Sequence, residues 1–276
     1  MRLGAHVPTR GRLASALRYA EQAGCEAIQI FVSNPRGWAP PVVTEESAGE
    51  FRSAASTADI APVFAHGSYL INIASPDTGF WQRSVELARR ELEAVSLVGG
   101  AGLVVHAGAG GPGERGQSLA RAAAATQAIA GAAPAEVVLE LTAGGAGTVA
   151  STLPQAAELL DAVGRDDVAL CVDTCHLFAA GYALDRPDGV RAAFDELTRL
   201  GLDGRLRLVH ANDAKDPRGS RRDRHEHVGM GHIGEEGFRA ILAEPAVQRC
   251  AVLVETPGKV EDDIRNLAVL RRLAGD

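Results

Sequence analysis

The sequence predicts an α/β fold in which one (β/α)8 barrel, a TIM barrel, occupies residues 1–276 as a single domain. Short segments rich in Val, Ile and Leu alternate with longer helix-like segments along the whole chain. Apolar segments of this kind are typical of parallel strands that are buried on both faces. Eight such units in 276 residues match the size of a TIM barrel.

The expected elements alternate regularly along the chain. Strands are expected at residues 2–7, 27–32, 62–66, 102–106, 136–141, 168–173, 206–210 and 251–255. Helix-like segments between them include residues 12–22, 82–98, 117–129, 153–163 and 261–273. Glycine-rich segments at 108–116 and 144–147 follow strands and are expected to be loops. A doubly wound open sheet is the alternative, but its G-x-G-x-x-G turn is missing after the first strand.

The composition is that of an ordinary globular protein, with 46% hydrophobic and 23% charged residues. A net charge of −7 argues against a surface that is basic throughout, although it leaves room for a local positive groove. No apolar run reaches the roughly 18 residues of a membrane span, and no secretory signal is recognisable. The 4 cysteines form no C-x-x-C pair, which favours a reduced, cytoplasmic location.

Residue types that bind metals close six consecutive expected strands. These strand-end residues are His66, His106, Glu140, Asp173, His210 and Glu255. The loops beyond add His176, Asp223 and His225, and none of the 8 histidines falls inside an expected helix. In a TIM barrel the carboxyl ends of the strands meet at one mouth, where the chemistry takes place. We therefore expect these nine side chains to lie together as metal ligands.

Imidazole and carboxylate groups suit zinc, and with less preference manganese or iron. Nine ligands are too many for one ion, whereas a carboxylate that bridges two ions can hold them about 4 Å apart. A single histidine at a strand end is more often structural. Six strand ends with the same tendency instead favour a cluster of two or three metal ions.

Several of these residues leave alternatives open. Asp173 and His176 could serve one metal or neighbouring metals, or Asp173 could simply cap a turn. Asp223 and His225 would point the same way in an extended loop, although alone they are typical of a solvated charged loop. The arginines that precede Asp223 are candidates for phosphate contacts. Cys175 is a candidate soft ligand, but a packed thiol is the favoured interpretation.

Three segments of the chain carry a resemblance to a known family. They are His66-Gly-Ser-Tyr-Leu-Ile-Asn-Ile-Ala74, Cys171-Val-Asp-Thr-Cys-His176, and His210-Ala-Asn-Asp-Ala-Lys215 continuing through Gly219-Ser220 to Asp223-Arg-His225. The last has a long and specific spacing, and Gly4-Ala-His-Val7 and Glu255-Thr256 extend the similarity over essentially the whole chain. With these segments the chain resembles endonuclease IV, the zinc-dependent apurinic/apyrimidinic endonucleases.

The resemblance implies three zinc ions, for which manganese or iron could substitute. One would be bound by His66, His106 and Glu140, a second by Glu140, Asp173, His210 and Glu255, and the third by His176, Asp223 and His225. It further implies that a hydroxide between the first two ions attacks the phosphorus 5′ to an abasic sugar, with Glu255 and Glu140 as the catalytic carboxylates. The products would be a 3′-hydroxyl and a 5′-deoxyribose phosphate, and removal of 3′-blocking groups is implied as well.

The same resemblance assigns the recognition of double-stranded DNA with abasic sites to two loops. Arg36, Tyr69 and Leu70 match residues that enter the base stack while the abasic nucleotide is flipped out, which costs little because no base is unstacked. Judged from the sequence alone, Arg36 is ordinary surface, and Tyr69 and Trp38 are equally well explained as core aromatics. The resemblance and the acidic surface also favour a monomer.

The chain departs from the family pattern beside three expected ligands. Ala107 stands where proline is usual, Leu141 where asparagine is usual, and Glu226 where another histidine is common. The first would change a loop over the cluster, and the second would remove a hydrogen bond near the metals. None removes a ligand, so we expect changes of rate and specificity rather than of the reaction.

Two other functions compete with this interpretation. A sugar isomerase or epimerase also gathers His, Asp and Glu at strand ends, but such a site usually needs only four metal ligands. A non-catalytic nucleic-acid-binding protein with structural zinc would be expected to have closed, cysteine-rich sites. Nine candidate ligands and few cysteines therefore favour the endonuclease.

Overall fold

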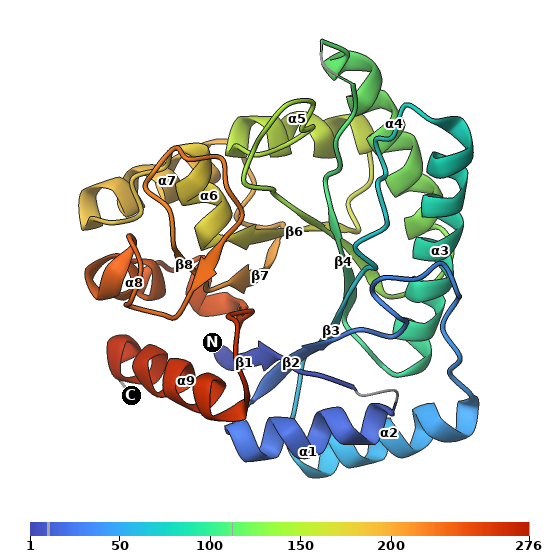
Figure 1. The fold of residues 1–276 in the computed structure, drawn as a ribbon, viewed down its shortest axis with the longest axis horizontal. Helices are drawn as coiled ribbons and strands as arrows, with labels where there is room; N and C mark the ends of the chain where they lie inside the picture. The colour runs from blue at the N-terminus through green and yellow to red at the C-terminus, as the bar shows by residue number, and fades with distance from the viewer. Residues whose placement is uncertain (10–11, 112, 276) are drawn as a thin grey trace.

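The computed structural model describes residues 1–9, 12–111 and 113–275. Within them, eight parallel strands close into a barrel in the order β1-β10-β7-β6-β5-β4-β3-β2. Helices surround this ring of strands, as Figure 1 shows. The predicted TIM barrel is therefore confirmed, and the alternative of an open doubly wound sheet is wrong because β1 pairs with both β2 and β10.

The strands of the barrel lie within one or two residues of the predicted segments. They are β1 (Arg2–His6), β2 (Ala27–Ile30), β3 (Val63–His66), β4 (Gly102–His106), β5 (Glu136–Glu140), β6 (Val168–Asp173), β7 (Leu206–His210) and β10 (Ala251–Val254). A separate antiparallel pair, β8 (Asp213–Ala214) with β9 (His225–Glu226), projects from the loop after β7. This pair brings His225 back to the end of the barrel, where its Nε2 lies 3.5 Å from Asp173 Oδ2 at the end of β6.

The helices lie outside the strands and cover them. They are α1 (Leu13–Ala23), α2 (Glu45–Thr57), α3 (Thr78–Leu97), α4 (Arg115–Ala130), α5 (Leu153–Val163), α6 (Thr174–Ala180), α7 (Pro187–Arg199), α8 (Gly234–Ala243) and α9 (Val260–Ala274), with a 3-10 turn η1 (Val247–Arg249). The longest, α3, begins earlier than expected because the Asp77 side chain accepts a hydrogen bond from the backbone N–H of Phe80 and caps its first turn. The loop expected at 108–116 ends early, since α4 begins at Arg115, and Pro112 lies outside the described residues. The loop expected at 144–147 is confirmed.

Two apolar layers position the site. Inside the barrel, side chains from every barrel strand except β1 form a small core: Ala27, Phe64, Val104, Val138, Ala169, Cys171, Leu208, Ala251 and Leu253. A larger core lies between the strands and the helices. The filled barrel interior leaves space for polar groups only at the ends of the strands.

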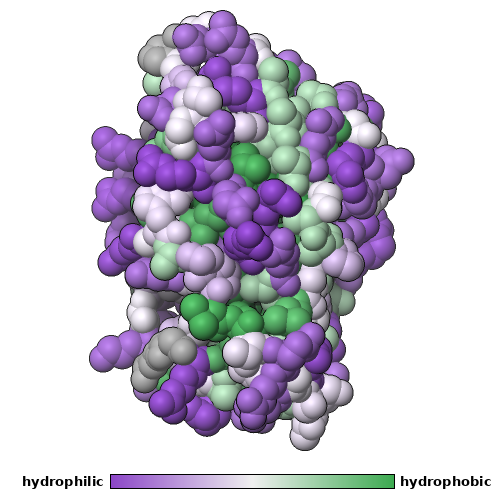
Figure 2. All heavy atoms as spheres, turned by 90° about the vertical axis from the view of Figure 1, so that its right-hand side faces the viewer, coloured by the Kyte–Doolittle hydropathy of each residue, from purple (hydrophilic) through white to green (hydrophobic). Residues whose placement is uncertain are grey.

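One face of the outer surface is mainly polar (Figure 2). On the side of α3 and α4, Figure 2 shows hydrophilic residues over most of the face, with a few hydrophobic residues gathered between them. No helix in the described part of the chain combines the length and apolarity that a membrane span requires.

Candidate metal centre

The structure brings all nine predicted ligands to the mouth formed by the carboxyl ends of the strands. Their ligand atoms form three groups within 4.8 Å: His66, His106 and Glu140; Glu140, Asp173, His210 and Glu255; and His176, Asp223 and His225. These are the three sets that the sequence analysis expected. Two further groups of this kind include a cysteine, Cys171 or Cys175.

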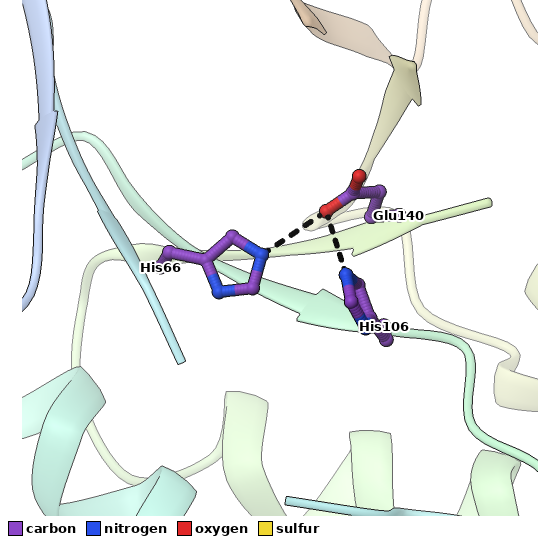
Figure 3. A group of neighbouring side chains, drawn as sticks. All are labelled: His66, His106 and Glu140. Carbon is purple, nitrogen blue, oxygen red and sulfur yellow. Dashed lines mark hydrogen bonds and ion pairs between the residues drawn. The ribbon is translucent and has the colours of Figure 1, made fainter. Parts of the chain in front are cut away.

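Glu140, at the end of β5, is the centre of the cluster and has no exposed surface. One of its oxygens lies 3.3 Å from His66 Nε2 and 3.4 Å from His106 Nε2, as Figure 3 shows. The other oxygen lies 3.3 Å from His176 Nδ1 and 3.2 Å from His210 Nδ1. Burial alone would raise the pKa of Glu140, but the surrounding histidines hold that pKa well below its usual value. Glu140 therefore carries a full negative charge that two metal ions could share.

Four of the five histidines are oriented by a carbonyl oxygen. The pairs are His66 Nδ1 with Gly67 O at 2.7 Å, His176 Nδ1 with Leu141 O at 2.8 Å, His225 Nδ1 with Glu255 O at 3.1 Å, and His210 Nε2 with Gln29 Oε1 at 3.0 Å. A carbonyl oxygen only accepts hydrogen bonds, so the ring nitrogen that contacts it must carry the hydrogen. In the neutral ring the other nitrogen, which faces the carboxylates, then holds the lone pair, and this is the arrangement of metal-binding histidines.

Two of these metal-facing nitrogens converge on one carboxylate. His176 Nε2 and His225 Nε2 both lie 3.1 Å from Asp223 Oδ1. Both nitrogens are buried, and neither forms a well-oriented hydrogen bond within residues 1–9, 12–111 and 113–275. A buried nitrogen without a partner is costly, and a cation bound between the two rings and the carboxylate would satisfy both. The donor set of nitrogen and oxygen atoms therefore fits zinc.

His176 was expected in a loop, but it lies in helix α6, and Asp173 explains the difference. Asp173 Oδ1 accepts a hydrogen bond of 2.8 Å from the backbone N–H of His176 and caps α6, so that the helix begins directly at the strand end. The capping role considered for Asp173 is thus confirmed. Its Oδ2 accepts a hydrogen bond of 2.6 Å from Asn212 and faces the cluster, so capping and metal binding are compatible.

Cys175, next to Asp173 and His225, packs as a buried thiol. Its S–H group donates to the backbone oxygen of Arg224 over 3.6 Å. Burial raises the pKa of Cys175 to about 12, which keeps the sulfur protonated and makes it a poor metal ligand.

The protonation of the cluster predicts how the metal-free protein responds to pH. Burial lowers the pKa of His66 and of His225, but nearby carboxylates outweigh it and raise each to about 9. In the unfolded chain these histidines have a pKa of about 6.5. Their protonated rings therefore stabilise the fold fully below pH 6.5, and this stabilisation is lost as the pH rises towards 9. The opposite holds for Glu140, Asp223 and Glu255, whose pKa values are depressed, so their contribution is lost as the pH falls below about 4.

We therefore expect the thermal midpoint of the metal-free protein to fall by several degrees between pH 6.5 and pH 9. With zinc bound, this decline should disappear, because metal ions require neutral imidazoles and bind more tightly as the pH rises. Thermal unfolding from pH 5 to pH 9, with a chelator and with zinc, measures both curves. A metal-free midpoint that stays level or rises over this range would contradict the arrangement of the histidines and carboxylates.

Two residues that support Glu255 were not predicted from the sequence. Gln29, fully buried on β2, donates to Glu255 Oε1 over 2.5 Å and accepts from His210. His6, at the end of β1, has its Nδ1 3.0 Å from the same oxygen, while its Nε2 finds no hydrogen-bond partner in the described residues. Burial lowers the pKa of His6 and keeps it neutral. His6 could have been predicted as a member of the site, because it is also a metal-binding residue type at the end of a strand.

A cavity of about 1090 Å³ opens from the cluster towards α1 and α9. Tyr69 stands at its rim, 59% exposed, with its ring 5.3 Å from that of Phe31 and 5.9 Å from that of His66. Arg36 is exposed and Leu70 is half-buried. Tyr69 is therefore not a core aromatic, and the three residues expected to contact DNA are accessible beside the cluster.

Comparison with known proteins decides the family. A family model described as a xylose isomerase-like TIM barrel matches residues 17–273. A protein of Methanoculleus marisnigri named probable endonuclease 4 is 42% identical, and the alignment covers 99% of each chain. The crystal structure of endonuclease IV from Thermus thermophilus superposes with a TM-score of 0.89 at 30% identity and covers 100% of this chain and 99% of that one.

The chain belongs to the endonuclease IV family. Its resemblance to that family is confirmed over nearly its full length. A D-tagatose 3-epimerase-like protein also superposes, with a TM-score of 0.76 at 17% identity and coverage of 100% and 97% of the two chains. At that identity the likeness extends only to the barrel fold.

The three positions at which the sequence analysis expected departures from the family pattern lie beside the cluster without opening it. Ala107 is buried, and its N–H donates to the backbone oxygen of Glu140 over 3.0 Å. Leu141 is buried as well, and its carbonyl oxygen orients His176. Glu226 lies on β9, 3.7 Å from Lys215 across the β8–β9 pair. An acidic group here makes this part of the rim less attractive to phosphate than a histidine would.

Proposed function

We propose that the chain is a DNA-repair endonuclease that hydrolyses the phosphodiester 5′ to abasic sites in duplex DNA. The observation that carries the proposal is the convergence of nine ligand side chains at the barrel mouth, with the metal-facing nitrogen defined for four of the five histidines. The relatives named endonuclease 4 and endonuclease IV support the same activity. A sugar epimerase would leave most of these ligands without a role.

We propose that the cluster holds three zinc ions in the three groups of residues described above. Such ions would activate water and neutralise the charge that develops on the phosphate. Glu140 would contribute to two of the groups, because its two oxygens face different pairs of histidines. Gln29 and His6 would hold Glu255 by hydrogen bonds to one of its oxygens and leave the other directed at His210, 3.1 Å away.

In the proposed reaction, the oxygen of a water molecule forms a bond to phosphorus, and Glu255 accepts the proton. The bond between phosphorus and the 3′ oxygen of the preceding nucleotide breaks, and that oxygen leaves as a hydroxyl after taking up a proton. The abasic sugar retains the phosphate on its 5′ side. Removal of blocking groups from 3′ ends would follow the same chemistry, since it breaks the same type of bond.

Recognition of the lesion would use the accessible side chains beside the cluster. Tyr69, Leu70 and Arg36 lie on the loops after β3 and β2 and can replace the stacking that the missing base no longer provides. The arginine-rich loop before β9 would contact phosphates, although Arg222 and Arg224 are partly neutralised by Asp216 at 3.5 and 3.4 Å. A single basic face on an acidic protein would make binding sensitive to salt.

The test is cleavage of an end-labelled duplex that carries one abasic-site analogue, with an undamaged duplex as control. The zinc-loaded protein should cut once, 5′ to the analogue, and leave the undamaged duplex intact. Prolonged chelation should abolish cleavage and added zinc should restore it, because the water and the phosphate would both depend on the cluster. Absence of cutting by a protein that carries its metals, together with turnover of a ketose, would favour the epimerase instead.

A further inference from the structure

Glu91, in the middle of α3, is a fully buried carboxylate that lies outside the metal cluster. Its Oε1 accepts a hydrogen bond of 2.5 Å from the Ser33 hydroxyl, and its Oε2 accepts one of 3.2 Å from the backbone N–H of Ser68. Both partners are neutral. Burial raises the pKa of Glu91 to about 7 although both hydrogen bonds lower it. A carboxyl group in this position is therefore expensive for the fold.

The two partners of Glu91 come from two different loops. Ser33 opens the loop after β2 that carries Arg36, and Ser68 directly precedes Tyr69 in the loop after β3. The loops also contact each other, because the Ser68 hydroxyl and the Tyr69 N–H both donate to the backbone oxygen of Pro35, each over 3.0 Å. Glu91 thus lies under a joint at which both loops meet.

The far end of the first loop is fixed to the same helix. The ring of Trp38 packs edge-on against Phe80, with 5.1 Å between the ring centroids. The guanidinium group of Arg83 lies 5.2 Å from the Trp38 ring. Since Phe80 and Arg83 belong to the first turns of α3, this helix holds the loop 33–38 at both ends.

We propose that Glu91 is a positioning residue, which keeps the loop of Arg36 and the loop of Tyr69 and Leu70 in fixed register for recognition of the abasic site. The proposal rests on the proposed function, in which these three side chains enter the base stack together. Side chains that insert together at one base-pair step of a duplex bind best when the distance between them is already fixed. Ordering a mobile loop on binding would instead cost conformational entropy. A packing role alone is the weaker explanation, since an apolar side chain of the same size would avoid the desolvation of a carboxylate.

Two substitutions separate positioning from packing. In Glu91→Gln, the amide can still accept from the Ser68 N–H and donate to the Ser33 oxygen, so both links survive. In Glu91→Met, the side chain keeps its volume but loses both links. Glu86→Met is the matched control, because Glu86 lies on the same helix with its side chain exposed.

The measurements are hydrogen exchange of the peptides that cover residues 33–38 and 67–70, binding of the abasic duplex, metal content and the thermal midpoint. In Glu91→Met we expect about tenfold faster exchange in these two segments and about tenfold weaker binding, the effect of losing one to two net hydrogen bonds. The metal content and the thermal midpoint should not fall. Glu91→Gln and Glu86→Met should both stay close to wild type.

Three results would overturn the proposal, and the first two are unchanged exchange of both segments in Glu91→Met, and faster exchange throughout the barrel with a lower thermal midpoint. The latter would make Glu91 a general stability residue. Faster exchange of the two segments without weaker binding of the abasic duplex would also overturn it, because the register would then not matter for recognition. If the wild-type protein itself shows no preference for abasic DNA, the proposed function fails, and exchange still decides whether Glu91 holds the loops.

Discussion

Glu140→Gln is expected to lower cleavage of the abasic duplex by on the order of a thousandfold, because metal-based stabilisation of this kind contributes several kcal/mol. The substitution keeps the shape of the side chain but removes the charge that four histidines face. If the amide N–H bonds faced His66 Nε2 and His106 Nε2, they would also occupy ring lone pairs that a metal ion needs. Measurement of bound metal by mass spectrometry should show fewer ions per chain than in wild type.

Glu136→Gln provides the matched control, since Glu136 begins the same strand and Glu140 ends it. Glu136 lies at the opposite end of the barrel and pairs with Arg207 over 3.2 Å at the surface. This variant should retain both metal content and cleavage, because an exposed ion pair contributes little. Full metal content and full activity in Glu140→Gln would refute the central role of this carboxylate.

The strand-end residues could be predicted because two independent regularities coincide in a TIM barrel. Runs of Val, Ile and Leu locate parallel strands, and parallel closure brings every carboxyl end to one mouth. His106, Glu140 and His210 each follow such a run directly, so their meeting required no knowledge of side-chain packing. The sequence therefore identifies the groups that meet, whereas their hydrogen-bond partners depend on the geometry of the barrel.

Gln29 illustrates what the sequence leaves open. It stands between Ile28 and Ile30 in an apolar run, where a lone polar residue gives no indication of its partners. The structure shows that it bridges His210 and Glu255, two residues that lie far away in sequence. A polar side chain inside a buried strand indicates that the side chain must form hydrogen bonds with some partner.

The burial of Glu91 and the helix α6 could not be predicted from the sequence for other reasons. Glu86, Glu91 and Glu93 look alike in the sequence, and only the packing of α3 against the loops decides that Glu91 alone is fully buried among them. The helix α6 has 7 residues, too few to show a helical period, and it begins without a loop after β6. Its first turn carries His176, which was therefore expected in a loop.

Gly4→Ala is expected to prevent correct folding of the barrel. Gly4 on β1 pairs in register with Ala27 on β2, and a Cβ at position 4 would lie 1.6 Å from the carbonyl oxygen of Ala27. That atom belongs to the backbone of the neighbouring strand, so relief requires the two strands to move apart. We expect a loss of more than about 4 kcal/mol, a large part of the roughly 5–15 kcal/mol that stabilises a folded domain.

Soluble yield and urea denaturation measure this effect, with Gly116→Ala as the control. Gly116 is exposed in the first turn of α4 and a Cβ there would meet no heavy atom within 4 Å among the described residues, so alanine should stabilise the protein by up to about 1 kcal/mol. A Gly4→Ala protein with the wild-type denaturation midpoint would show that β1 and β2 do not pack as closely as described. The same register aligns His6 with Gln29, the two residues that hold Glu255. A shift of β1 along β2 would therefore displace the support of the proposed catalytic carboxylate even in the fraction of protein that still folds.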